Sequence, residues 1–201
     1  MRRFLSASFL VAFALSVAGW TPGSDTVPVA VIEQASRSVF LVTTEIDGER
    51  RRCSGFLIAD ERILTAGHCT GETMTVAGIP ATILNADAYY DLALLAAPIH
   101  GTPLILRDLP VARFEELVAI GHAYGWQRLL TLHVRVYYVD MTPAEGMRPG
   151  LLVKPGYIGG MSGGPVIDAA GQVVGIIQAS NHDLGYGIGV VLIRAFLVGL
   201  Q

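Results

Sequence analysis

Short apolar runs separated by turn residues recur roughly every ten positions along most of this chain. The runs are rich in Val, Ile, Leu and Thr, which favour strands, and most of them are too short to form helices. Many short strands at even spacing predict an all-β sandwich or barrel rather than an alternating α/β fold. The expected strands cover residues 38–45, 55–59, 63–66, 74–77, 81–84, 92–96, 117–121, 129–139, 151–154, 165–168, 173–178 and 186–191.

A linker at residues 98–110, which contains three prolines, divides these strands into two comparable halves. The halves, at about residues 29–97 and 111–191, suggest two small barrels that face each other. A chain of 201 residues is long enough for one large domain or for two such lobes. Only residues 192–200, at the end of the chain, have the pattern of a helix.

The segment that follows the first expected strand carries a hairpin signal. Asp47 and Gly48 are a pair of residues that readily forms the tight turn between two antiparallel strands. The adjacent cluster at residues 49–52, a glutamate followed by three arginines, is most simply a solvated loop. We therefore expect the chain to turn here and to expose these charged side chains.

The N-terminus has the pattern of a secretory signal peptide. Residues 1–18 begin with Met-Arg-Arg, continue in a largely apolar run without charge, and end in Ser-Val-Ala. Small residues at the positions that a signal peptidase reads predict cleavage after Ala18. The run is short for a membrane span, which needs about 20 residues, and an uncleaved anchor is the alternative. Residues 19–28 are then a flexible lead-in to a domain that occupies residues 29–201.

The composition of the chain limits its possible partners. The formal net charge of −3 gives no support for nucleic-acid binding, and 52% hydrophobic residues against 15% charged ones argue against long disordered tails. No second apolar stretch of spanning length, free of charge and turn residues, follows the first. We therefore expect the mature protein to be soluble and secreted or periplasmic, without stable membrane insertion.

The two cysteines, Cys53 and Cys69, fit an oxidising compartment. An even number of cysteines in an exported chain favours a disulfide. A metal site built on the two cysteines is the weaker alternative, because no matching pair of ligands lies at metal-site spacing. The sequence therefore gives no reason to expect a bound metal.

Residues 159–165 read Gly-Gly-Met-Ser-Gly-Gly-Pro, so that four glycines and a proline surround a single hydroxyl. Glycine and proline disfavour the interiors of helices and strands, and the run suits a tight loop whose backbone approaches another group closely. If Ser162 is a nucleophile, the glycines leave the backbone N–H groups of Gly160 and Ser162 free to face a developing oxyanion. An ordinary glycine-rich turn is the alternative that the run alone leaves open.

A serine hydroxyl becomes a strong nucleophile only when a base removes its proton and an acid orients that base. His68 is the candidate base, because an apolar strand delivers it at a bend that Cys69 can fasten to Cys53. Asp91 is the candidate acid: it begins an apolar run, where water is scarce and a carboxylate needs a partner such as His68. Asp87 lies in a less apolar setting and ranks second. The remaining histidines are interpreted as structural or surface residues, namely His100, His122, His133 and His182.

Three stretches of the chain together resemble the chymotrypsin-like serine proteases. They are Thr-Ala-Gly-His-Cys at residues 65–69, Asp-Leu-Ala-Leu-Leu at residues 91–95 and Gly-Met-Ser-Gly-Gly-Pro at residues 160–165. They occur in the family's His…Asp…Ser order, and Cys53 is placed for the family's disulfide beside the histidine. Residues 117–125 are similar, more weakly, to the segment with which bacterial HtrA-type members open their second barrel. The likeness covers roughly residues 30–198 and implies two six-stranded antiparallel β-barrels with a short C-terminal helix.

The resemblance implies a role for each matching residue. Ser162 would attack the scissile carbonyl, and His68 would take its proton and later deliver it to the leaving amine. Asp91 would hold the tautomer of the imidazole and stabilise the imidazolium. The N–H groups of Gly160 and Ser162 would form the oxyanion hole. Such a mechanism implies neither a metal nor a cofactor.

The resemblance also indicates where a substrate would bind. Residues 175–180 correspond to the strand along which the substrate backbone pairs. One wall of the primary specificity pocket would comprise Gln178, Ala179 and Ser180. Gly156 lies six positions before Ser162, where an acidic residue would favour Arg or Lys in the substrate. Small or medium apolar side chains are therefore the expected preference, although Asp183 lies in a loop that could reach the pocket.

Met161 stands where digestive and clotting members carry an aspartate that pairs with a newly cleaved N-terminus, so activation by N-terminal insertion is not expected. The leading hypothesis is an exported serine endopeptidase that acts on protein or peptide substrates. The alternatives are a catalytically silent binding or chaperone module of the same fold, and an esterase that uses the same triad. HtrA-type proteins usually append PDZ domains, whereas this sequence runs only to Gln201, so the likeness is to an HtrA-type protease domain without one.

Overall fold

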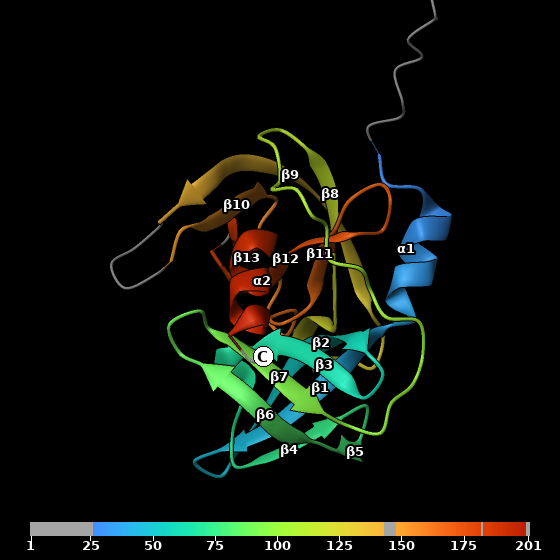
Figure 1. Ribbon diagram of the computed structural model, residues 1–201, viewed down its shortest axis with the longest axis vertical. Helices are drawn as coiled ribbons and strands as arrows, with labels where there is room; N and C mark the ends of the chain where they lie inside the picture. Colours follow the sequence, from blue (N-terminus) through green and yellow to red (C-terminus); the bar gives the residue numbers. More distant parts are fainter. Residues whose placement is uncertain (1–25, 143–147, 182, 200–201) are drawn as a thin grey trace, which may run out of the picture.

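The computed structural model describes residues 26–142, 148–181 and 183–199, which form two β-units and two short helices (Figure 1). The first unit is a curled antiparallel sheet with the strand order β5-β4-β1-β2-β3-β7-β6. Its strands are β1 (Val39–Ile46), β2 (Glu49–Ala59), β3 (Arg62–Ala66), β4 (Thr73–Val76), β5 (Ile79–Pro80), β6 (Thr82–Asp87) and β7 (Leu92–Ala96). A 3-10 turn, η1 (Gly67–Cys69), follows β3 directly.

The second unit is a closed antiparallel barrel with the strand order β10-β13-β12-β11-β8-β9. Its strands are β8 (Glu116–Gly121), β9 (Leu130–Met141), β10 (Gly150–Lys154), β11 (Pro165–Ile167), β12 (Val173–Ser180) and β13 (Gly185–Gly189). The 3-10 turn η2 (Ala123–Gly125) lies between β8 and β9, and helix α2 (Val190–Val198) follows β13. The prediction of an all-β, chymotrypsin-like fold with a short C-terminal helix is confirmed. The first unit differs in detail, because the short β5 gives it seven strands and the hydrogen-bonded order leaves β5 and β6 at its two edges.

The hairpin between β1 and β2 is confirmed, but the loop expected after it is wrong. Asp47 and Gly48 both have positive φ, 53° and 76°, as a tight hairpin turn of this kind requires. Residues 49–52 are the start of β2, and Glu49 pairs with Ile46 in the ladder with β1. Their charged side chains are exposed, so the solvent exposure was predicted correctly while the backbone conformation was not.

Residues 29–36 form helix α1 (Val29–Ser36), where the sequence pattern had placed the start of the first barrel. The carbonyl of Pro28 accepts the N–H groups of Val31 and Ile32 and so begins the helix. Helix α1 buries Ile32 and Ala35, which lie three positions apart on one face. No helix in the part of the chain that the structure describes is long and apolar enough to cross a bilayer. The expected signal peptide, residues 1–18, lies outside the described residues.

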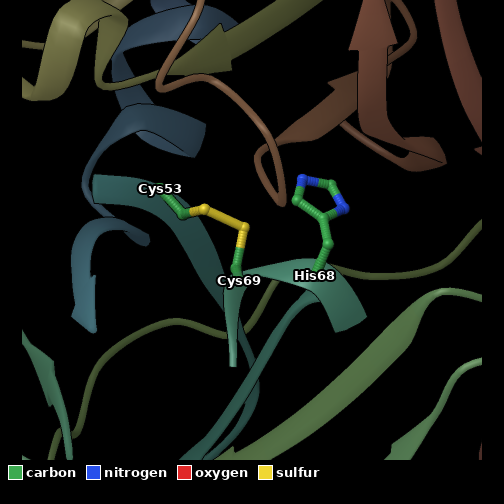
Figure 2. A group of neighbouring side chains, drawn as sticks. All are labelled: Cys53, His68 and Cys69. Carbon is green, nitrogen blue, oxygen red and sulfur yellow. A yellow bond between two sulfur atoms is a disulfide. The ribbon is translucent and has the colours of Figure 1, made fainter. Parts of the chain in front are cut away.

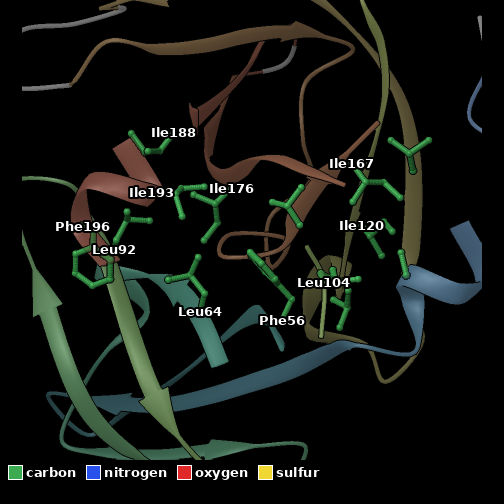
Figure 3. Packing of buried hydrophobic residues seen from close by; sticks show 14 of the residues in the cluster. Phe56, Leu64, Leu92, Leu104, Ile120, Ile167, Ile176, Ile188, Ile193 and Phe196 are labelled. Atoms are coloured by element: carbon green, nitrogen blue, oxygen red, sulfur yellow. The ribbon is translucent and has the colours of Figure 1, made fainter. Parts of the chain in front are cut away.

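The main hydrophobic core joins the two β-units. Phe56 of β2 and Leu64 of β3 pack in one cluster with Ile120 of β8 and Ile176 of β12 (Figure 3). Helix α2 contributes Ile193 and Phe196 to the same cluster. Burial of this apolar surface fixes one unit against the other. The loop after β3, the loop before β7 and strand β12 lie near this shared core and are therefore held at fixed relative positions.

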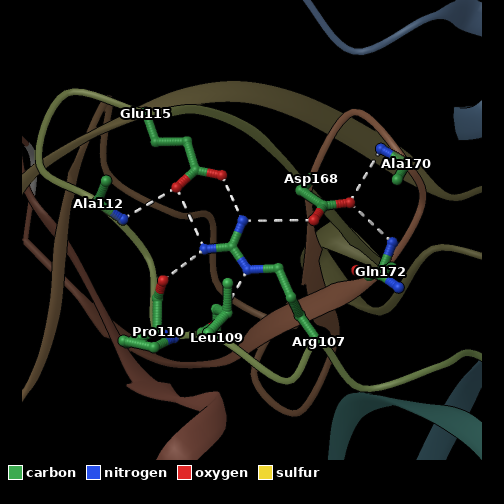
Figure 4. Close-up of polar contacts among 8 residues, drawn as sticks. All are labelled: Arg107, Leu109, Pro110, Ala112, Glu115, Asp168, Ala170 and Gln172. Carbon is green, nitrogen blue, oxygen red and sulfur yellow. Dashed lines mark hydrogen bonds and ion pairs between the residues drawn. The ribbon is translucent and has the colours of Figure 1, made fainter.

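Arg107, in the linker between the two units, forms an ion-pair network with the second barrel (Figure 4). Its Nη1 donates to Glu115 Oε1 at 2.5 Å and to Asp168 Oδ2 at 3.3 Å, and its Nη2 donates to the Pro110 carbonyl. The bond to Glu115 raises the pKa of Arg107. Burial favours a higher pKa for Glu115, but the Arg107 bond, the Ala112 N–H and the Arg107 charge together lower it.

Replacing Arg107 by methionine should lower the free energy of unfolding by about 3 kcal/mol at neutral pH, because two poorly hydrated carboxylates lose their partner. A carboxyl whose pKa is lowered in the folded state stabilises the fold above its unfolded pKa, and this contribution is lost as the pH falls through the folded pKa. The difference from wild type should therefore shrink as Glu115 protonates below about pH 4.5. Urea unfolding at pH 7 and at pH 4 measures both effects.

The matched control is Arg135→Met, since Arg135 pairs with Glu116 on β8 but has a half-exposed side chain. Exposed ion pairs contribute about 0–1 kcal/mol, so this variant should lie close to wild type at both pH values. Equal losses of stability in the two variants would contradict a special role for the Arg107 network.

Candidate active site

His68 and Asp91 come together at one end of the first β-unit. His68 lies on η1 directly after β3, and Asp91 directly precedes β7, the neighbour of β3 in the sheet. His68 Nδ1 lies 2.8 Å from Asp91 Oδ2, and the backbone N–H of His68 donates to Asp91 Oδ1 at 2.7 Å. Gly67 makes this approach possible, because a Cβ there would lie 3.0 Å from Asp91 Oδ1.

This geometry defines the chemical state of the imidazole. An ionised carboxylate only accepts hydrogen bonds, so when Asp91 is ionised and His68 is neutral, Nδ1 carries the proton and Nε2 is an acceptor. The side chains of His68 and Asp91 are 46% and 37% exposed, respectively. The expectation that Asp91 sits where water is scarce is therefore wrong. Two hydrogen bonds, rather than a dry environment, hold its carboxylate.

Asp87, the second candidate for the acid, has a different role. Its Oδ1 accepts the backbone N–H groups of Tyr89 at 2.6 Å and Tyr90 at 3.1 Å. This is the usual task of an aspartate in a turn. Asp91, not Asp87, is the carboxylate that contacts His68.

Ser162 lies in the glycine-rich loop between β10 and β11, which is held against β12. Gly163 N–H donates to the Ile177 carbonyl at 2.8 Å, and the Ser162 hydroxyl donates to the Gln178 carbonyl at 3.0 Å. Among the described residues, no hydrogen bond joins the Ser162 hydroxyl to His68. The structure thus places the hydroxyl against β12, where it donates to the Gln178 carbonyl rather than to His68.

The backbone of the glycine-rich loop presents two free donors. The Gly159 carbonyl accepts the N–H of Tyr124 at 2.6 Å, and the peptide from Gly159 to Gly160 is trans. Because C=O and N–H point in opposite directions in a trans peptide, the Gly160 N–H is directed away from Tyr124. Neither this N–H nor that of Ser162 donates to an acceptor within the described part of the chain. Such a pair of unpaired donors can bind an anionic oxygen.

Ser54, a buried residue of β2 that lies in none of the predicted motifs, connects the first β-unit to this loop. Its N–H donates to the Ser162 carbonyl at 2.7 Å and its hydroxyl donates to the Gly160 carbonyl at 3.0 Å. The same hydroxyl accepts the His122 N–H at 2.8 Å. Only its position beside Cys53 could have drawn attention to it, because its partners lie 68 to 108 residues away in the sequence.

Cys53 of β2 and Cys69 of η1 form a disulfide beside His68 (Figure 2). Both sulfurs lie within 4.8 Å of a His68 nitrogen, the spacing of a small metal site. The disulfide occupies both sulfurs, however, and leaves the imidazole as the single ligand of the group. The bond therefore fastens the turn that carries His68 to the strand that carries Ser54.

A cavity of about 530 Å³ opens beside Ser162. It is lined by Tyr124, Gly156, Tyr157, Ile158, Gly159, Ser162, Ile177, Gln178, Ala179, Ser180 and Asn181. The structure thus brings all four residues predicted for substrate binding to one cavity. Asp183 does not line it, although its N–H donates to the side chain of Asn181. The phenol of Tyr157 has no hydrogen-bond partner among the described residues, and burial raises its pKa.

The other histidines that the structure describes do not contact the Asp91 carboxylate. His122 is buried with Nδ1 at 2.8 Å from the Trp126 carbonyl, and burial lowers its pKa despite this hydrogen bond. His100 and His133 are exposed, and His182 lies outside the described residues. Met161 is fully buried in the apolar core of the second barrel.

A sequence model of the family described as "Trypsin-like peptidase domain" matches residues 53–176, which is more than half of the chain. Serine protease Rv3671c of Mycobacterium tuberculosis is 28% identical over 146 residues, 65% of this chain and 36% of that protein. A probable periplasmic DegP-like serine endoprotease of Ectopseudomonas mendocina is 26% identical over 171 residues, 77% of this chain and 36% of that protein. The chain thus spans about a third of the length of these curated relatives.

Solved structures show the same fold. The active form of the Rv3671c protease superposes with a TM-score of 0.75 at 21% identity and covers 88% of each chain. The HtrA-type protease AlgW with a decapeptide superposes with a TM-score of 0.71 at 17% identity, over 85% of this chain and 66% of that one. The match to the family model includes His68, Asp91 and Ser162. The chain therefore belongs to the family of trypsin-like peptidase domains.

Proposed function

We propose that this protein is a serine endopeptidase that hydrolyses peptide bonds with Ser162, His68 and Asp91. The observation that carries the proposal is the 2.8 Å contact between His68 Nδ1 and Asp91 Oδ2, which leaves Nε2 as a base. Membership of the trypsin-like peptidase family supports the assignment of this base to a serine nucleophile.

The reaction proceeds in two halves. The Ser162 Oγ bonds to the scissile carbonyl carbon while its proton passes to His68 Nε2, and this proton then goes to the leaving amine as the C–N bond breaks. Water, deprotonated by the same Nε2, then attacks the acyl carbon, and Nε2 returns this proton to the Ser162 Oγ as the bond from Oγ to the acyl carbon breaks and the acid product leaves. Asp91 keeps the proton on Nδ1 and stabilises the imidazolium that forms in each half.

The first step requires the Ser162 hydroxyl to leave the Gln178 carbonyl. Rotation about the Cα–Cβ bond can move the hydroxyl between two acceptors without any change of the loop backbone. A substrate N–H that donates to the Gln178 carbonyl would compete for that acceptor and favour the rotated hydroxyl. Substrate binding would thereby align the nucleophile with the base.

The Gly160 and Ser162 N–H groups form the proposed oxyanion hole. The Gly159 carbonyl accepts the Tyr124 N–H, which fixes the peptide that carries the Gly160 N–H. The Gly160 carbonyl accepts the Ser54 hydroxyl, which fixes the next peptide, between the two donors. Donors held in place before the reaction stabilise the tetrahedral intermediate without a further cost of reorganisation.

The cavity beside Ser162 is the proposed primary specificity pocket. Its lining contains Ile158 and Ile177 but no acidic side chain among the described residues. A lysine or arginine side chain would find no countercharge there, so small or medium apolar side chains are preferred. The buried Met161 provides no carboxylate for a new N-terminal amine, and activation by N-terminal insertion is not part of the proposal.

Export to the periplasm or the exterior is part of the same proposal. The basic and apolar pattern of residues 1–18 supports it, as do the DegP-like relatives that are described as periplasmic. The Cys53–Cys69 disulfide is also typical of an oxidising compartment.

A catalytically silent binding module is the second candidate, and the contact of the Ser162 hydroxyl with Gln178 rather than His68 favours it. A fluorophosphonate probe separates the two. We expect stoichiometric labelling of the wild-type protein, with the adduct located on Ser162 by mass spectrometry, and no labelling of Ser162→Ala. Ser36→Ala, in helix α1, is the matched serine control and should react like wild type.

Failure of the folded wild-type protein to react would rule out the peptidase proposal and favour the silent module. Labelling combined with cleavage of p-nitrophenyl esters, but not of unfolded protein or peptides, would identify an esterase instead.

A further inference from the structure

A second cavity, of about 370 Å³, opens beside His68 and Asp91. It is lined by His68, Ala88, Tyr89, Tyr90, Asp91, Arg148, Gln178, Ala179, Tyr186 and Ile188. It shares Gln178 and Ala179 with the cavity beside Ser162, so the two cavities adjoin at these residues. Three tyrosines and one arginine give this second cavity its chemical character.

Arg148 is held in a fixed orientation in this cavity. Its Nε donates to the Tyr89 carbonyl at 2.9 Å, and its guanidinium carbon lies 3.2 Å from the centre of the Tyr89 ring. The Tyr186 hydroxyl donates to the Arg148 carbonyl at 2.5 Å and so fixes the backbone as well. A guanidinium stacked on an aromatic ring keeps its outer N–H edge directed away from that ring.

The terminal nitrogens of Arg148 have no acceptor among the described residues, and no described carboxylate lies within 4.0 Å of them. Asp91, the acidic group that lines the same cavity, directs its carboxylate to His68. Burial raises the pKa of Tyr186, although the hydrogen bond to the Arg148 carbonyl opposes this rise. Within the described part of the chain, Arg148 is therefore a half-buried cation whose terminal N–H donors have no acceptor and can bind a ligand.

We propose that Arg148 binds a carboxylate of the substrate, an Asp or Glu side chain among the residues that precede the scissile bond. The inference rests on the proposed function. If the side chain of the residue under attack enters the cavity beside Ser162, the preceding residues run along Gln178 and Ala179. Because successive side chains of an extended peptide point to opposite sides, the next one faces the cavity of His68 and Arg148.

The chemistry of the Arg148 guanidinium explains why a carboxylate is the proposed ligand. The planar guanidinium presents two parallel N–H donors, which match the two oxygens of a carboxylate. A hydrogen bond to a charged group in a half-buried site is strong enough to change kcat/KM by roughly ten- to a hundredfold. The neutral amide side chains of Gln and Asn have the same shape as those carboxylates but lack the charge, so they should raise kcat/KM much less.

Paired peptides that differ only by Glu or Gln test the proposal. Glu and Gln are placed in turn at each of the three positions before the cleaved bond, and the readout is the ratio of kcat/KM for the two members of a pair. Wild type should prefer Glu at one of these positions by at least about tenfold. Arg148→Gln should bring this ratio close to one, and Arg148→Glu should lower it below one, because the new carboxylate repels the Glu peptide.

Arg113→Gln is the matched control. Arg113 also stacks on aromatic rings, those of Phe114 and Tyr138, but it does not line the cavity, so the Glu/Gln ratio should stay as in wild type. A wild-type ratio near one at all three positions, or a ratio that Arg148→Gln leaves intact, would overturn the proposal.

Binding to the Ser162→Ala variant separates this inference from the proposed function. Fluorescence anisotropy with the same peptide pairs requires no hydrolysis, and Glu should again bind more tightly only when Arg148 is present. Binding with this dependence but no hydrolysis by wild type would retain the carboxylate site and reject the peptidase. Hydrolysis without any Glu preference in rate or binding would retain the peptidase and reject the site.

Discussion

Asp91→Asn should lower kcat/KM about ten-thousandfold, as the equivalent change does in a protease whose triad has been dissected. The Asp91 carboxylate accepts both the His68 ring N–H and the His68 backbone N–H. An asparagine amide has one acceptor atom and one donor group, so a donor would face the ring and favour the tautomer that carries the proton on Nε2. An imidazole in that tautomer cannot take the proton of Ser162.

The backbone makes this substitution a test of chemistry rather than of folding. Asp91 has a φ of 52°, in the left-handed region, and asparagine is among the residues that tolerate this conformation best. The melting temperature of Asp91→Asn should therefore stay close to that of wild type. The measurement is peptide hydrolysis under pseudo-first-order conditions, with thermal unfolding followed in parallel.

Asp87→Asn is the control for the same chemical change four residues away. Asp87 accepts two backbone N–H groups through one oxygen, and an asparagine oxygen can accept the same pair. This variant should retain kcat/KM to within about twofold, which corresponds to the small effect of surface substitutions. Similar losses at both positions would show that the turn, not the contact with His68, determines activity.

Local sequence patterns predicted the parts of the molecule that depend on near neighbours. The apolar run before His68 and the one that begins with Asp91 form adjacent strands, β3 and β7, as expected. The Asp47–Gly48 turn has the φ angles that its residue types favour. Helix α1 was missed because its eight residues bury only Ile32 and Ala35, a pattern too sparse to distinguish from a short strand.

Groups that act through distant contacts could not be predicted in the same way. The Ser54 hydroxyl reaches a carbonyl 106 residues away, and Arg148 reaches the Tyr89 carbonyl across 59 residues. Neither residue lies in a motif, and their roles arise only when the two β-units are packed together. The exposure of Asp91 was also misjudged, because an apolar run that follows a residue does not fix how much water reaches its side chain.

The glycine-rich run was predicted as a loop, but its glycines differ in what they permit. Gly160 has a φ of 92°, and a Cβ there would lie 2.5 Å from the His122 carbonyl oxygen and 2.8 Å from the Gly125 nitrogen. A Cβ at Gly159 would meet no atom within 4 Å. Glycine is therefore required at Gly160, which supplies the proposed oxyanion donor, and also at Gly163 and Gly164, where a Cβ would lie 2.2 Å from a backbone carbonyl oxygen, but not at Gly159.

Gly160→Ala should consequently lower kcat by about a hundred- to a thousandfold, the effect of losing one oxyanion donor. The new Cβ cannot stay 2.5 Å from a backbone oxygen, so the peptide must turn and carry the Gly160 N–H away from the proposed hole. KM should change little, since Gly160 does not line the cavity beside Ser162. Steady-state kinetics with one good peptide substrate measures both constants.

The control for backbone strain is Gly78→Ala, at a glycine with a φ of 80° in the turn between β4 and β5. A Cβ there meets no atom within 4 Å, so this variant has the left-handed strain of Gly160→Ala without the contact. It should lose about 1 kcal/mol of stability and retain its kcat. If Gly160→Ala kept its kcat while both variants lost similar stability, the Gly160 N–H would not be an oxyanion donor, and the hole would have to be built from other groups.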